Sequence, residues 1–154
     1  MKKTQDRTQK NRKVRVAAYC RVSTLMEMQD SSYETQRDYY VQLISANPAY
    51  ELVGIYGDHG ASGRSMVKRP QFRRMLQDCE EGKIDMILTK SISRFARNLP
   101  DCIRTIRRLQ ELKIPVLFEK ESINTLDVKS ELLLNVLATV AEEESVSIFN
   151  NIPR

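Results

Sequence analysis

Apolar residues fall along the chain in short compact runs that alternate with longer stretches of helical spacing. Short, mostly apolar runs without a helical period are typical of buried strands. Four such runs occur, and they are Val14–Cys20, Leu52–Tyr56, Ile84–Leu88 and Pro115–Phe118. Apolar residues three and four apart predict helices from Ser31 to about Ala46, from Pro70 to a stop at Gly82, from Asp101 to Leu112, and from Ser130 to about Ile148.

Capping and turn residues mark the ends of these helices. Ser31 and Glu34 form a capping box at the start of the first helix, and Pro48 follows its end. Pro70 suits the first position of a helix, whereas Gly82 suits the position just after one. The stretches expected as loops are Gly57–Lys68 and Thr89–Arg97.

Strands that alternate with helices predict an α/β fold. We expect a mostly parallel sheet of four to five strands, with helices on both faces and a long C-terminal helix. A chain of 154 residues suits one such domain. The expected divisions are a basic flexible tail over 1–13, the folded domain over 14–148, and a short end over 149–154. Ligands of parallel sheets bind outside the carboxyl ends of the strands, so functional groups should follow the strands.

Composition argues against a membrane or exported protein. Hydrophobic residues make up 41% and charged residues 29%, as in soluble globular proteins. No segment approaches the ~20 apolar residues that span a bilayer, and Met1–Lys13 lacks the apolar core of a signal peptide. Cys20, Cys79 and Cys102 lie in apolar stretches and are expected to be free thiols of a cytoplasmic protein.

The net charge of +5 comes from the N-terminal tail. Six of the 25 Lys and Arg residues and one of the 20 Asp and Glu residues lie within 1–13, so the rest of the chain is neutral. The tail is expected to be a solvated arm or a contact for phosphates. Nucleic-acid binding by the domain must therefore be argued from the positions of its arginines.

A serine and several arginines follow the first three predicted strands. Arg21 and Ser23 follow the first, Arg69 the second, and Arg94 and Arg97 the third. On a helical turn, Arg94 and Arg97 would share a face. Guanidinium groups bind phosphate oxygens in pairs and stay charged at any working pH. Together these side chains could bind a phosphodiester and stabilise its transition state.

Simpler interpretations of these residues remain open. A serine after a strand is often a helix cap, and paired arginines are often solvated or salt-bridged. The chain has no Walker phosphate loop, and Gly60–Gly63 lacks the spacing of a hydrolase elbow. A serine–histidine–acid site would depend entirely on His59, the only histidine. We expect no metal and no cofactor, because metal-ligating residues do not cluster in the sequence.

The motif residues resemble the serine site-specific recombinases, the resolvase/invertase family. The similarity begins with Tyr19-x-Arg21-Val22-Ser23-Thr24 and continues, in the expected order and spacing, through Gln36, Asp58, Ala61-Ser62-Gly63, Arg69-Pro70 and Ser93-Arg94-x-x-Arg97-Asn98. It covers nearly all of Val14–Ile148. The stretch Lys90–Asn98 is more similar to the large serine recombinases, integrases and transposon recombinases, than to the small resolvases.

The resemblance implies a role for each matching residue. Ser23 would be the nucleophile, and it would form a 5′-phosphoserine bond to DNA and release a 3′-hydroxyl. The arginines that would hold the scissile phosphate are Arg21, Arg69, Arg94 and Arg97. The residues that would support this group are Tyr19, Gln36, Asp58, Ser62 and Glu144. Neither metal nor ATP would be needed, since the covalent bond retains the energy of the phosphodiester.

The resemblance also implies partners, which are double-stranded DNA and further copies of the chain. Dimers would pair through the long C-terminal helix, and two dimers would form a synaptic tetramer. The apolar stripe of that helix suits such a face, although burial within one subunit explains it equally well; its residues are Leu132, Leu133, Val136, Leu137, Val140 and Ala141.

Two features depart from the family pattern. Ser93 stands where small members often have Asp. Large recombinases continue past the long helix into DNA-binding domains, and we expect none here because the chain stops at Arg154. Two further hypotheses therefore stay open beside a recombinase catalytic domain: a truncated module that oligomerises without cutting DNA, and a phosphate-ester or nucleotide-binding protein.

Overall fold

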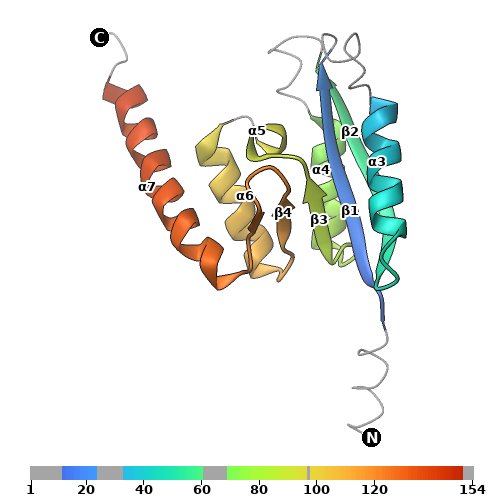
Figure 1. Ribbon diagram of the computed structural model, residues 1–154. Helices are drawn as coiled ribbons and strands as arrows, with labels where there is room; N and C mark the ends of the chain where they lie inside the picture. Colours follow the sequence, from blue (N-terminus) through green and yellow to red (C-terminus); the bar gives the residue numbers. More distant parts are fainter. Residues whose placement is uncertain (1–11, 24–32, 61–68, 97, 151–154) are drawn as a thin grey trace, which may run out of the picture.

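The computed structural model describes residues 12–23, 33–60, 69–96 and 98–150, and for residues 23, 60 and 144–150 only the backbone. Each predicted strand and helix is present (Figure 1). The elements in chain order are β1 (Val14–Ser23), α3 (Tyr33–Ser45), β2 (Tyr50–Gly60), α4 (Pro70–Glu80), β3 (Met86–Thr89), α5 (Ile92–Phe95), α6 (Leu99–Glu111), β4 (Val116–Phe118), β5 (Ile123–Asn124) and α7 (Val128–Asn150).

The sheet confirms the predicted α/β class. Its five strands are ordered β2-β1-β3-β4-β5, all parallel except β5, which pairs antiparallel with β4. Strand order reverses between β1 and β3, because the chain moves outward from β1 to β2 and then returns to the other side of β1. The carboxyl ends of β1 and β3 meet at this point, where ligands of such sheets bind.

A bulge sets the register between β1 and β2. Val16 pairs with Leu52, but Ala17 pairs with Gly54, so Val53 is an extra residue on β2. Extra residues of this kind change which side chains face each side of a sheet. Beyond the bulge, Arg21 pairs with Asp58.

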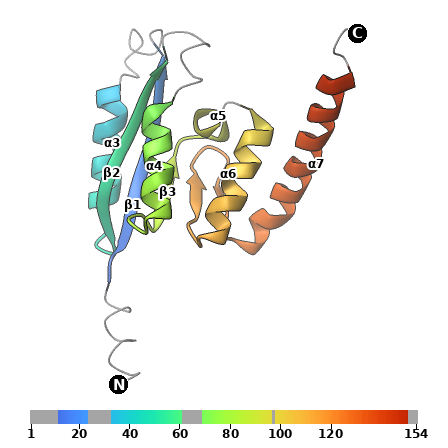
Figure 2. The same cartoon turned by 180° about the vertical axis from the view of Figure 1, so that it is seen from behind.

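Helices cover both faces of the sheet, as expected. Helix α3 lies on one face, whereas α4, α5 and α6 lie on the other (Figures 1 and 2). The larger core is on the second face and includes four aromatic rings packed edge to face, with centroids 5.0–6.5 Å apart. These rings belong to Tyr19, Phe72, Phe95 and Phe118. The smaller core packs α3 against β1 through residues that include Val16, Cys20, Tyr40 and Ile44.

The predicted ends of α4 are confirmed. Pro70 is its first residue, and Gly82, just beyond it, has a φ of 75°, which favours glycine. Helix α6 begins at Leu99, two residues earlier than predicted, because the Asn98 side chain accepts a hydrogen bond from the Asp101 backbone.

Two predicted loops are partly wrong. The loop expected from Gly57 starts later, because β2 continues to Gly60 alongside β1. The loop expected over Thr89–Arg97 contains the short helix α5, which Ser91 caps by accepting a hydrogen bond from the Arg94 backbone at 3.3 Å.

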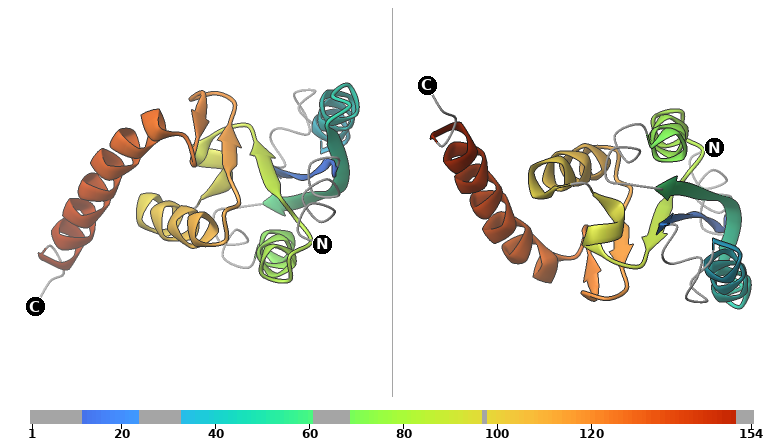
Figure 3. Two further views of the ribbon diagram at one scale, coloured as in Figure 1. Left: turned by 90° about the horizontal axis from the view of Figure 1, so that it is seen from below. Right: turned by 90° about the horizontal axis from the view of Figure 1, so that it is seen from above.

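Helix α7 buries less of its apolar side than the sequence suggests. Leu134 and Ala141 are buried at 1% and 5% exposure, but Leu132 and Val136 are 73% and 53% exposed. Helix α7 packs on α6 and leads away from the sheet (Figure 3). Burial within one subunit therefore explains Ala141 but not the exposed members of the predicted stripe, such as Leu132 and Val136.

Several expectations lie outside the described residues. They are the tail over 1–11, Ser31 of the capping box, and the loop residues 61–68. Among the described residues, no helix is both long enough and apolar enough to cross a membrane. Cys20, Cys79 and Cys102 are free and buried, as expected.

Candidate active site

A buried hydrogen-bond chain joins β1, β2 and α4 at the carboxyl edge of the sheet. The Tyr19 hydroxyl donates to Asp58 Oδ2 at 2.8 Å. The two Asp58 oxygens also accept from the backbone N–H groups of Gln71 at 3.0 Å and Phe72 at 3.1 Å. Asp58 therefore caps the N-terminus of α4 from a neighbouring strand, where a carboxylate is electrostatically favoured.

Arg69 extends this chain of hydrogen bonds. Its side chain is buried, its Nε donates to the Tyr19 hydroxyl at 3.2 Å, and its Nη2 donates to the Phe95 carbonyl. Its guanidinium carbon also lies 3.7 Å from the centroid of the Phe72 ring, in cation–π geometry. Burial raises the pKa of Tyr19, and the charge of Arg69 opposes that shift.

Arg21 and Arg94 meet on the side of the sheet edge where β1 ends. Arg94 Nη1 donates to the Arg21 carbonyl at 3.0 Å. Burial, together with the positive charges of Arg69 and Arg94, lowers the pKa of Arg21. Burial also lowers the pKa of Arg94. In the described part of the chain, Arg21 Nη1 is buried and has no hydrogen-bond partner.

The supporting residues of α5 were not predicted from the sequence. Ser91 caps this helix, and Glu121 Oε1 accepts from its first backbone N–H, that of Ile92, at 3.2 Å. Thr89, fully buried at the end of β3, donates to the Tyr19 carbonyl at 3.2 Å. Ser91 carries a helix-capping signal in the sequence, but the roles of Thr89 and Glu121 depend on tertiary contacts.

The structure brings together five of the predicted site residues, and these are Tyr19, Arg21, Asp58, Arg69 and Arg94. Ser23 ends β1, with its backbone paired to Gly60, and Gln36 is half-buried on α3. Glu144 belongs to α7, but only its backbone is described. Ser62 and Arg97 lie outside the described residues. Helix α5 ends at Phe95, and the face expected to be shared by Arg94 and Arg97 falls partly outside the described residues.

This arrangement defines a class of site. The charges of Arg69 and Arg94 both act on the guanidinium of Arg21, at the switch point of a doubly wound sheet. Close like charges are unfavourable unless an anion neutralises them. The fold and site together are those of an α/β domain with arginine side chains gathered at the carboxyl edge of its sheet.

Comparison with known proteins identifies the family. Residues 16–152 match the family "Resolvase, N terminal domain", and the chain belongs to it. Among solved structures, it is similar to a resolvase family site-specific recombinase from Streptococcus pneumoniae, with 34% identity, a TM-score of 0.70, and coverage of 88% of this chain and 91% of that one. The N-terminal catalytic domain of TP901-1 integrase is also similar, with 28% identity, a TM-score of 0.70, and coverage of 85% and 96%.

Curated relatives are longer than this chain. The Transposon Tn21 resolvase of Escherichia coli is 31% identical over 115 residues, which cover 70% of this chain and 60% of the relative. The Transposon Tn2501 resolvase of the same organism is 28% identical, over 84% of this chain and 63% of the relative. The match thus spans about three-fifths of the length of these relatives.

Proposed function

We propose that this chain is the catalytic domain of a serine site-specific DNA recombinase. The observation that carries the proposal is the buried Arg21 Nη1, which has no partner among the described residues and lies beside two further arginines. A buried donor without an acceptor is costly. An oxygen of a DNA phosphate would satisfy it, and the same charges would stabilise the phosphorane transition state.

The reaction exchanges one phosphodiester for another. The Ser23 oxygen attacks the phosphorus and loses its proton, the bond to the 3′ oxygen breaks, and that oxygen gains a proton. The product is a 5′-phosphoserine and a free 3′-hydroxyl. Reversal of the step rejoins DNA without ATP, because one phosphate ester bond replaces another and the energy of the phosphodiester is kept. One of the arginines would assist this proton transfer by hydrogen bonding to the 3′ oxygen as it leaves.

Family membership supports the remaining proposed roles. Arg97 would hold the phosphate with Arg21 and Arg94. Ser62, Gln36 and Glu144 would support the reacting groups, and we infer no metal or other cofactor in the chemistry. Arginine suits this work because its charge is permanent and its fork matches phosphate oxygens.

The proposed partners are double-stranded DNA and other copies of the chain in the cytoplasm. The exposed apolar side chains of α7 support pairing through that helix, first as a dimer and then as a synaptic tetramer. Its exposed members are Val128, Leu132, Leu133, Val136 and Val140. Base-reading contacts would come from segments or proteins beyond the catalytic domain.

A second candidate function is a module that oligomerises with full-length partners and cuts nothing. The exposed face of α7 favours association with other copies whether or not the site reacts. The clustering of Arg21, Arg69 and Arg94 favours the enzyme, since a silent module has no need to hold these charges together.

The test is to fuse the chain to a heterologous DNA-binding domain and supply duplex DNA with a randomised segment between two of that domain's sites. We expect a covalent protein–DNA adduct with Ser23 present and none with Ser23→Ala. If the intact fusion binds its sites and gives no adduct, the oligomerisation module is the better account.

A further inference from the structure

Arg69 combines an unfavourable backbone with a buried charge. Its φ of 27° and ψ of 61° lie in the left-handed region, which residues other than glycine seldom adopt. Pro70 follows it and further disfavours helical angles at this position. Its side chain is 6% exposed. A conformation of this kind persists only where the surrounding contacts hold it in place.

Those contacts come from three elements. Arg69 reaches Tyr19 on β1 through Nε, Phe95 at the end of α5 through Nη2, and the Phe72 ring on α4 through the face of the guanidinium. It also lines a cleft of about 450 Å³ between α4 and α6. The Arg69 guanidinium therefore makes both of these hydrogen bonds, and its ring stacking, with protein groups.

Arg21 and Arg94 differ from Arg69 in this respect. The Arg94 side chain donates to the backbone carbonyl of Arg21, and Arg21 has a buried nitrogen without a partner among the described residues. Both side chains are partly exposed, whereas Arg69 is buried. These two arginines are the better placed to receive a phosphate.

We propose that Arg69 is a positioning residue, which fixes the end of α5 against Tyr19 and thereby places Arg94 beside Arg21. The family resemblance implies that Arg69 binds the phosphate, whereas in this proposal Arg69 does not contact it. The role rests on the proposed function, because Arg94 needs its position only if it binds phosphate. Phe95 transmits the effect: it follows Arg94 directly, its ring is fully buried, and its carbonyl accepts from Arg69.

Amide hydrogen exchange tests the positioning role without DNA. The N–H groups of Phe95 and Ala96 bond to Ser91 and Ile92 at 3.1 and 3.0 Å within α5. We expect Arg69→Met to speed exchange at both amides by about ten-fold or more, since a charge-assisted hydrogen bond is lost. Exchange at Cys102, on α6, should stay unchanged. The matched control is Arg73→Met, because Arg73 is an exposed arginine in the first turn of α4, close to Arg69 in the sequence.

Adduct kinetics of the fusion protein supply the second measurement. We expect Arg69→Met to slow adduct formation at saturating DNA by about ten-fold or more. The DNA concentration at half saturation should stay within about two-fold, because no phosphate contact is lost. Arg69→Lys should rescue little, since an ammonium cannot bond Tyr19 and Phe95 in the same fork geometry. If Arg69→Met fails to fold, Arg69→Lys serves in the exchange experiment.

The outcomes separate this proposal from the proposed function. Unchanged exchange at Phe95 and Ala96, with weaker DNA half saturation, would show that Arg69 binds the phosphate and would overturn the positioning role. An intact protein that never forms an adduct would overturn the recombinase function, while faster exchange in Arg69→Met would still establish the contact with α5.

Discussion

Asp58 shows how a single residue serves both the fold and the site. Its carboxylate caps α4 and also accepts from the Tyr19 hydroxyl, so β1, β2 and α4 share one buried acceptor. At 7% exposure it has little access to water, and its two oxygens are satisfied by protein donors. The motif indicates that Asp58 belongs to the site, but its capping role follows only from the three-dimensional arrangement.

We predict that Arg94→Ala abolishes strand cleavage but spares the fold. Loss of one preorganised donor to the transition state lowers the rate by at least about 100-fold. The Arg94 side chain is only partly buried and donates to the Arg21 carbonyl at the edge of the sheet, so the melting transition should remain cooperative. Adduct yield and thermal unfolding check this, with Arg104→Ala, 76% exposed, as control. Loss of the cooperative transition would mean that Arg94 is structural.

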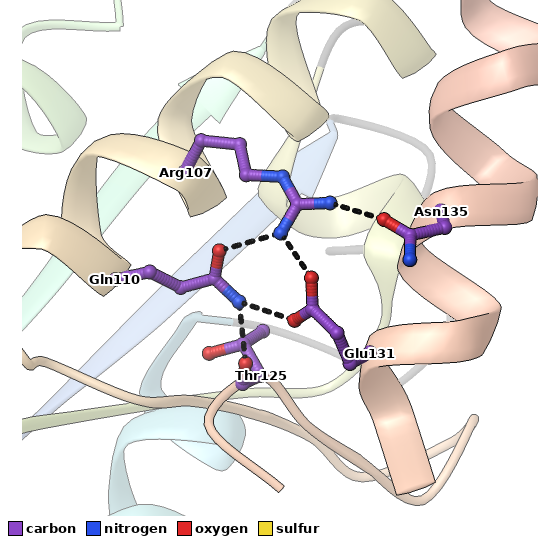
Figure 4. Close-up of polar contacts among 5 residues, drawn as sticks. All are labelled: Arg107, Gln110, Thr125, Glu131 and Asn135. Carbon is purple, nitrogen blue, oxygen red and sulfur yellow. Dashed lines mark hydrogen bonds and ion pairs between the residues drawn. The ribbon is translucent and has the colours of Figure 1, made fainter. Parts of the chain in front are cut away.

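At the scale of elements, a polar cluster holds α7 on α6 (Figure 4). Arg107 on α6 donates to Glu131 at 2.7 Å and to Asn135 at 2.8 Å on α7. Gln110 donates to the Thr125 carbonyl at 2.7 Å, just before α7, and to Glu131 at 3.3 Å. Because α7 buries few apolar side chains, this cluster is a main support of its first turns.

We predict that Arg107→Ala loosens the start of α7. The side chains of the Arg107–Glu131 ion pair are 36% and 45% exposed. The loss of folding free energy should therefore be small, about 1 kcal/mol. Amide exchange should speed up in the first half of α7 and stay unchanged in α4. Arg104→Ala, whose ion pair lies within α6, is the matched control. Equal exchange in both variants would contradict a role for the cluster.

The sequence predicts some elements better than others, for physical reasons. Strands β1 to β4 and helices α4 and α6 have the hydrophobic period, proline and glycine that define them locally. The four-residue helix α5 has no room for a period and depends on Ser91 and Phe95. The apolar side of α7 has the right spacing, but spacing does not reveal whether the partner surface belongs to the same chain.

At the scale of the whole molecule, the exposed face of α7 predicts self-association. Val136→Lys should weaken it, because burying an ammonium in an apolar interface is costly. Sedimentation velocity at increasing protein concentration checks this, with Gln42→Lys, an exposed polar position on α3, as control. Identical sedimentation of the intact chain and Val136→Lys, both as monomers at every concentration, would count against the α7 interface.

Stability should also fall at alkaline pH. Burial raises the pKa of Cys20, Cys79 and Cys102 to about 12. The unfolded thiols titrate near 8.5. The folded state therefore binds more protons than the unfolded state above that pH, so the stabilising contribution is complete below about pH 8.5 and is lost as pH rises towards 12. Urea unfolding at pH 7 to 11 measures this, and a free energy of unfolding that stays constant to pH 11 would contradict it.

The proposed roles of Ser23 and of the arginine cluster depend on which residue forms the covalent bond to DNA. The most direct measurement is mass spectrometry of the proteolysed adduct between the fused domain and DNA. The account predicts one modified peptide, with a 5′-linked nucleotide on Ser23, and no such peptide from Ser23→Ala. A nucleotide attached to any other residue, or the same adduct from Ser23→Ala, would contradict it.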